Sequence, residues 1–106
     1  FTETVLALER GAPRRLPCGA GVGYLSVAAD GSLSLCHRFA GTPAFGVGDV
    51  FRGFDRAAAA GILAGLTARA AACDGCWARW LCGGPCHFDL ACPEEEVGPG
   101  ATRCRA

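Results

Sequence analysis

The stretch that decides the fold is Cys73–Cys86, CDGCWARWLCGGPC, where four cysteines follow the pattern C-x2-C-x5-C-x3-C. Cys104 closes this run after seventeen further residues. Upstream, Cys18 and Cys36 bracket Gly31 in the pattern C-x12-G-x4-C. Cysteines grouped at such short spacings, with turn residues between them, are typical of thiolate metal ligands. The sequence therefore predicts a metal-binding domain.

Three interpretations fit the eight cysteines. A disulfide framework is used by small secreted domains, but bunched cysteines separated by turn residues argue against it. Structural zinc is the second interpretation, because two sites of four thiolates would use all eight residues. A pair of iron–sulfur clusters is the third, since soft thiolates alone do not separate zinc from iron.

The order of the cysteines favours iron–sulfur clusters. Cys73, Cys76 and Cys82 lie within ten residues and can converge on one cubane, whereas the turn 83–85, Gly-Gly-Pro, redirects Cys86. In two-cluster ferredoxins the fourth cysteine of such a run also binds the other cluster. By the same logic Cys104 completes the near cluster. Cys86 then shares a second cluster with the two upstream cysteines.

Composition sets limits on size and partners. A chain of 106 residues with sixteen glycines lies near the lower limit of what an apolar core stabilises unaided. Ten acidic residues balance ten arginines, with no basic face for phosphate, so a nucleic-acid partner is not expected. No apolar run approaches the length of a membrane span, and no leader marks secretion. We therefore expect a cytoplasmic protein without a membrane partner.

Local patterns predict the secondary structure. Residues 2–10 form a short amphipathic pattern that ends at Gly11, which suits a helix C-cap. Apolar residues alternate on both sides of Asp30-Gly31, which indicates a β-hairpin whose second strand delivers Cys36. Residues 41–53 read as a glycine-broken loop.

A longer helix is predicted after this loop. Asp55 is the expected N-cap, and residues 56–72 have high helix propensity, with Ile62, Leu63 and Leu66 forming an apolar stripe that can lie on the hairpin. The predicted fold is a small α+β domain: a β-hairpin, a helix and cysteine-rich loops, stapled by two iron–sulfur clusters. We expect residues 1–16 to be the end of an upstream region plus a linker, and residues 17–106 to form the cysteine-rich domain.

The seven spaced cysteines together with Gly31 resemble the SPASM domain, the C-terminal extension of radical S-adenosylmethionine enzymes that modify peptides and proteins. Finer features are most similar to the maturases of quinohemoprotein amine dehydrogenase, which form thioether cross-links in a small protein subunit. These features are the sequences CHRFAG at 36–41, GDVFRG at 48–53 and CDGCWARWLCGGPC at 73–86.

The resemblance implies two auxiliary 4Fe-4S clusters. Cys18, Cys36 and Cys86 match the ligands of auxiliary cluster I, and the remaining matches, to auxiliary cluster II, are Cys73, Cys76, Cys82 and Cys104. The fourth position of cluster I is left open, filled by Cys92, or filled by a residue upstream of the chain. His37 and His87 each follow a matched cysteine, and we assign neither of them a ligand role.

The chain departs from the family in one respect that limits its chemistry. The C-x3-C-x2-C motif that holds the radical-generating cluster is absent, because Asp89 stands where Cys82-x3-Cys86 would need a third cysteine. This segment alone would not cleave S-adenosylmethionine, which would bind only in an upstream radical core. The resemblance implies electron transfer and the binding of a substrate peptide or small protein subunit. The alternative is a non-catalytic zinc-binding interaction module.

Overall fold

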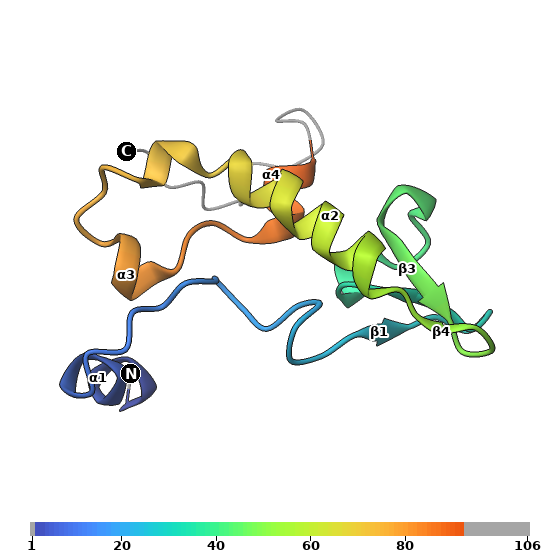
Figure 1. Cartoon of the computed structure of the whole chain (residues 1–106), viewed down its shortest axis with the longest axis horizontal. Coiled ribbons are helices and arrows are strands. Elements are labelled where there is room, and N and C mark those ends of the chain that lie inside the picture. The colour runs from blue at the N-terminus through green and yellow to red at the C-terminus, as the bar shows by residue number, and fades with distance from the viewer. Residues whose placement is uncertain (1, 93–106) are drawn as a thin grey trace. The chain divides into compact units, whose positions relative to one another are not determined.

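The computed structural model describes residues 2–92 of the chain, which fall into two compact units (Figure 1). Unit 2 is the continuous segment Gly19–Thr67. Unit 1 is made from the chain on both sides of it, Phe1–Cys18 and Ala68–Ala106. The predicted domain limits, 1–16 and 17–106, stay a prediction.

Unit 2 is built around a four-stranded antiparallel sheet in the order β1-β2-β3-β4. The strands are β1 Ser26–Val27, β2 Ser32–Ser34, β3 Gly46–Asp49 and β4 Gly53–Phe54. Each strand pairs with the next one in sequence, so the sheet is a meander. Together with the helices, this sheet confirms the α+β class that the sequence predicted.

The predicted hairpin is present as β1 and β2. Val27 lies opposite Leu33, and Gly31 has the positive φ of 84° that the turn requires. The Asp30 side chain accepts a hydrogen bond from the Ser32 backbone N–H at 2.9 Å, which holds the turn. The second strand ends at Ser34, so Cys36 lies just beyond the sheet rather than in it.

The prediction that residues 41–53 form a loop is wrong, because they contain β3 and the start of β4. Pairing of β2 with β3 joins Ser32 to Asp49 and Ser34 to Gly46, which leaves one extra residue on β3. Such a bulge bends the strand and favours glycine where φ is positive, and Gly48 has φ 114°. The glycines that suggested a loop therefore serve a strand.

The predicted long helix is α2, Arg56–Ala68. Asp55 caps it as expected, since its Oδ1 accepts a hydrogen bond from the Ala58 backbone N–H at 2.9 Å. Of the predicted apolar stripe, Leu66 is buried, whereas Ile62 and Leu63 are half-buried. The helix ends before residue 72, and a 3-10 turn follows at Ala71–Cys73.

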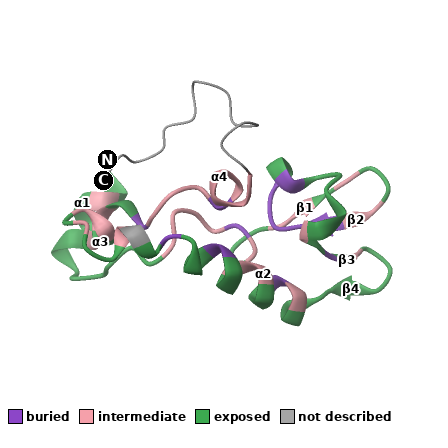
Figure 2. Ribbon diagram, turned by 90° about the horizontal axis from the view of Figure 1, so that it is seen from above, coloured by how far each residue is buried: buried purple, intermediate pink, exposed green. Residues whose placement is uncertain are grey.

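The apolar core lies almost entirely in unit 2. Leu35, Phe39 and Val47 are its largest fully buried side chains, and Phe39 stacks at a tilt on Phe45 with ring centroids 4.4 Å apart. Figure 2 shows these buried segments as purple stretches in and beside the sheet. The side chains of unit 2 thus form a small but continuous apolar centre.

Unit 1 contains three short helices, α1 Thr2–Glu9, α3 Arg79–Cys82 and α4 His87–Ala91. The predicted C-cap of α1 is present, because Gly11 has φ 59° and its N–H donates to Leu8 O at 3.0 Å. The Ala12 N–H donates to Ala7 O at 2.8 Å, which completes a Schellman motif. No residue of α1 is buried. The helix α4 was not predicted from the sequence.

No helix within residues 2–92 has both the length and the apolar character that spanning a bilayer would need. The segment 93–100, which the sequence indicates as a loop, and Cys104 lie outside the described residues.

Two Gly→Ala substitutions should shift stability in opposite directions. At Gly48 an added Cβ would meet Gly53, with its carbonyl carbon at 3.2 Å and its oxygen closer, and φ is positive. We expect Gly48→Ala to lower the free energy of unfolding by more than about 1 kcal/mol. Gly61 lies in α2 with nothing within 4 Å, so Gly61→Ala should raise it by about 0.5–1 kcal/mol. Urea unfolding of both variants measures these changes in the free energy of unfolding. Equal changes in the two variants would contradict the bulge at Gly48.

The turn between β3 and β4 should respond to acid. The backbone N–H groups of Arg52 and Phe51 donate to Asp49 Oδ1 and hold the pKa of Asp49 below its ordinary value of 3.8. A pKa that is lower in the folded chain adds stability above pH 3.8, and that stability is lost as pH falls through the folded pKa. NMR should show both amide protons titrating together with the Asp49 carboxyl carbon. Amide shifts that stay constant would show that these hydrogen bonds are absent.

Candidate metal centre

Seven of the eight cysteines lie within residues 2–92. Cys36 is the one that belongs to unit 2, and the other six described cysteines belong to unit 1. Those six are Cys18, Cys73, Cys76, Cys82, Cys86 and Cys92. Cys104, the predicted fourth ligand of auxiliary cluster II, lies outside the described residues.

Three cysteines sit on consecutive tight turns in unit 1. The N–H of Cys76 donates to the carbonyl of Cys73 at 3.1 Å, and the N–H of Arg79 donates to the carbonyl of Cys76 at 3.0 Å. Cys82 ends α3, and its N–H donates to Ala78 O at 2.8 Å. The thiols of Cys73 and Cys76 are half-buried, whereas that of Cys82 is exposed. The short spacing therefore forms a chain of turns, as the sequence predicted.

The turn from Cys82 to Cys86 depends on two glycines with positive φ, Gly83 at 80° and Gly84 at 101°. The Cys82 thiol donates to Gly84 O at 3.6 Å across this turn. This reversal is the one that the Gly-Gly-Pro sequence predicts, and it lies between Cys82 and Cys86. Both glycines take the left-handed conformation that side chains disfavour.

The segment before Cys18 lies against this turn. The Arg14 backbone N–H donates to Trp80 O at 2.8 Å. A Cβ added to Gly83 would lie 2.8 Å from the carbonyl carbon of Leu16 and closer to its oxygen, so the two backbones touch where Gly83 has no side chain. Leu16 is two residues from Cys18, and Gly83 is three residues from Cys86.

Cys36 is held by unit 2 alone. Its side chain is buried, and its backbone is extended, with φ −155° and ψ 170°, where the 3-10 helix His37–Phe39 begins. The Ser34 hydroxyl donates to Cys36 O at 3.2 Å. His37 is exposed, whereas its neighbour Cys36 is buried.

The donor chemistry fits a soft metal, but the described side chains are not gathered around one point. Cysteine thiols on short turns, such as those of Cys73, Cys76 and Cys82, are the ligands that zinc and iron–sulfur clusters use. Within residues 2–92, however, no three His, Cys, Asp or Glu side chains lie close enough together to hold a metal ion. The structure therefore supplies the ligand types and their turns, and the two ligand sets stay a prediction.

His87 is the one buried histidine of the described chain, with 3% of its surface exposed. It begins α4 directly after Cys86, and its Nδ1 has no hydrogen-bond partner within residues 2–92. Burial lowers the pKa of the imidazole, because the charged form loses water. Cys92 follows the same helix, and its N–H donates to Phe88 O at 3.0 Å. Sequence reasoning missed this burial, since α4 has no strong helix signal.

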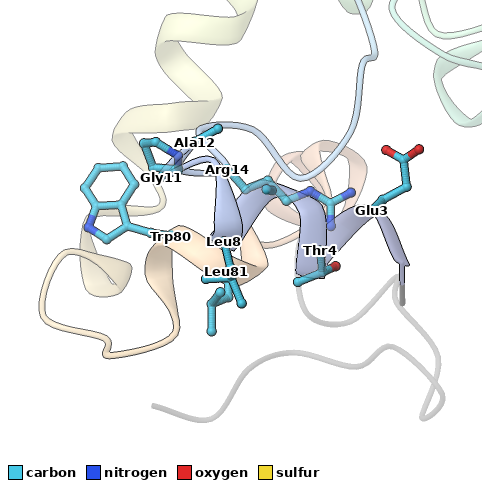
Figure 3. A pocket seen from close by; sticks show the side chains of 10 residues that line it. Glu3, Thr4, Leu8, Gly11, Ala12, Arg14, Trp80 and Leu81 are labelled. Carbon is cyan, nitrogen blue, oxygen red and sulfur yellow. The ribbon is translucent and has the colours of Figure 1, made fainter.

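A separate cavity in unit 1 lies beside α1 and α3 (Figure 3). Its volume is about 570 Å³. Figure 3 shows the Trp80 ring at one end and the charged groups of Glu3 and Arg14 at the other. Trp80 is 55% exposed, and Trp77 outside the cavity is 88% exposed. Both indole rings face solvent in the described chain.

Comparisons of the chain with protein-family models, curated protein sequences and solved structures find no match. The resemblance to SPASM domains rests on the spacing of the cysteines and Gly31. The family assignment and the function that it implies therefore stay predictions.

Substitution at Gly83 should disturb the contact with Leu16. An alanine side chain there overlaps the Leu16 carbonyl, so Gly83→Ala should speed hydrogen exchange at the Arg14 N–H, which bonds to Trp80 O next to this contact. We also expect a loss of more than about 1 kcal/mol in the free energy of unfolding. Gly75→Ala is the matched control, because Gly75 has nothing within 4 Å. Similar exchange rates in the two variants would argue against the contact.

Proposed function

We propose that this chain is an auxiliary iron–sulfur domain of a radical S-adenosylmethionine enzyme that modifies a peptide or small protein. Auxiliary cluster II would be held by Cys73, Cys76, Cys82 and Cys104. Auxiliary cluster I would be held by Cys18, Cys36 and Cys86, with its fourth position open, filled by Cys92 or filled from upstream.

One observation carries this proposal: most of the described cysteines lie in unit 1, whereas most of the buried apolar side chains lie in unit 2. Among the described residues, unit 1 has six of the seven cysteines but a single buried apolar side chain, Ala70. Unit 2 has the rest of the buried apolar side chains and only Cys36. A unit that lacks an apolar core needs other stabilisation, and thiolate–metal bonds provide folding free energy directly. This distribution supports metal ligation in unit 1.

The turns of unit 1 give further support. Three thiols follow one another on hydrogen-bonded turns, and the Gly83–Gly84 reversal then changes the direction of the chain before Cys86. The contact between Leu16 and Gly83 brings the segment that leads to Cys18 against this reversal. With about 3.8 Å between consecutive Cα atoms, two or three residues allow Cys18 and Cys86 to reach a common group. This arrangement fits their assignment to the same cluster.

A bound cluster of this kind accepts and releases single electrons, with a potential set by burial and by hydrogen bonds to sulfur. The chain's own part would be to hold the thiolates on its turns. Glycine-rich turns also let backbone N–H groups come close to sulfur, and Gly83 is buried. Cleavage of S-adenosylmethionine would belong to a radical core upstream, because this chain lacks C-x3-C-x2-C. The substrate peptide would be held near that core.

Metal analysis of anaerobically reconstituted chain tests the proposal. We expect about eight iron and eight sulfide per chain, with broad charge-transfer absorption. Cys73→Ala and Cys18→Ala should each remove about half of the iron, because each variant loses a ligand of a different cluster. Asp74→Asn is the matched control within the same turn, and its iron content should not change.

Other outcomes would decide against the proposal. Colourless chain with about two zinc ions would show the zinc-binding module instead. Loss of all iron from either cysteine variant, with folding retained by circular dichroism, would indicate one shared site rather than two clusters.

A further inference from the structure

Unit 2 contains an open groove of about 660 Å³, well within the size range of ligand sites. It lies between the loop 21–25, the strand residue Phe54 and the first two turns of α2. Three exposed apolar side chains line it, with exposed fractions of 70% for Val22, 48% for Tyr24 and 37% for Phe54. Exposed apolar residues gathered on one concave surface favour a bound partner.

The charge of the groove selects the partner. Arg56 is its one charged lining residue, and within residues 2–92 no carboxylate forms an ion pair with it. The neighbouring carboxylate, Asp55, does not line the groove and is used to cap the Ala58 N–H. Arg56 also starts α2, where the helix dipole is positive. A carboxylate is therefore the complementary charge.

The loop that forms one wall is already ordered by its own hydrogen bonds. Gly19 O accepts from the N–H groups of Val22 at 3.0 Å and Gly23 at 2.7 Å, and the Gly21 N–H donates to Tyr24 O at 2.9 Å. A wall that does not need to be ordered on binding loses less conformational entropy.

We propose that this groove binds a peptide segment in which an acidic residue neighbours an aromatic or aliphatic residue. The carboxylate pairs with the Arg56 guanidinium, and the apolar side chain lies among the exposed apolar residues of the groove, Val22, Tyr24 and Phe54. This inference adds detail to one part of the proposed function, the holding of a substrate peptide. The statement that the bound peptide is a substrate rests on that proposed function.

Fluorescence anisotropy with the full chain tests the groove. The probe is a fluorescein-labelled, C-amidated peptide, Ser-Val-Glu-Phe-Val-Ser, and its partner has Gln in place of Glu. We expect Arg56→Gln to weaken binding of the Glu peptide about tenfold and to leave binding of the Gln peptide unchanged. Arg52→Gln is the matched control, because Arg52 is 90% exposed in the same unit but does not line the groove. It should bind as the unchanged chain does.

The groove assignment is overturned if neither peptide binds. It is also overturned if Arg56→Gln does not weaken binding of the Glu peptide, or if the Gln peptide binds the unchanged chain as tightly as the Glu peptide does. Equal weakening by Arg52→Gln would overturn it as well. It is also overturned if the peptide-free chain self-associates in sedimentation and Arg56→Gln abolishes this, because the occupant is then a second copy.

Iron measured on the same samples separates the two proposals. If peptide binding depends on Arg56 in a chain that contains no iron, the groove proposal is supported and the iron–sulfur proposal is contradicted. Iron present without any peptide binding removes the groove alone.

Discussion

Within residues 2–92, the cysteine-rich part of the chain has almost no apolar core. Among the residues that the structure describes, unit 1 buries one apolar side chain, Ala70, while unit 2 buries Leu35, Phe39 and Val47 completely. Hydrophobic burial is the main driving force for folding in water, so the two units cannot be stabilised in the same way. Unit 2 has its own sheet and buried side chains, whereas the described part of unit 1 is held by backbone hydrogen bonds and turns.

Features that depend on a few neighbouring residues could be predicted from the sequence. Asp30-Gly31 predicted the hairpin, and Asp55 predicted the start of α2, because each sets the backbone through its own side chain or its own φ. Gly11 predicted the end of α1 for the same reason. The Gly-Gly-Pro sequence likewise predicted the reversal after Cys82, while the ligand role of the cysteines stays a prediction. All of these signals act over about five residues or fewer.

Features that depend on distant residues could not be predicted. The run 41–53 reads as a loop, because the role of Gly48 becomes visible only when β2 is placed beside β3 and the bulge requires a positive φ. The contact between Leu16 and Gly83 joins residues far apart in sequence, and the burial of His87 depends on what surrounds α4. The groove at Arg56 was missed as well, because its walls come from a loop, a strand and a helix.

Unit 1 is assembled from two separated parts of the chain, with the whole of Gly19–Thr67 between them. On the ribosome, unit 2 is complete as soon as Thr67 has emerged, and its strands pair only with neighbours in sequence. Leu16, by contrast, must wait for Gly83 to be translated before their backbones meet. The order of synthesis therefore gives the sheet time to form before the thiol-bearing turns come together.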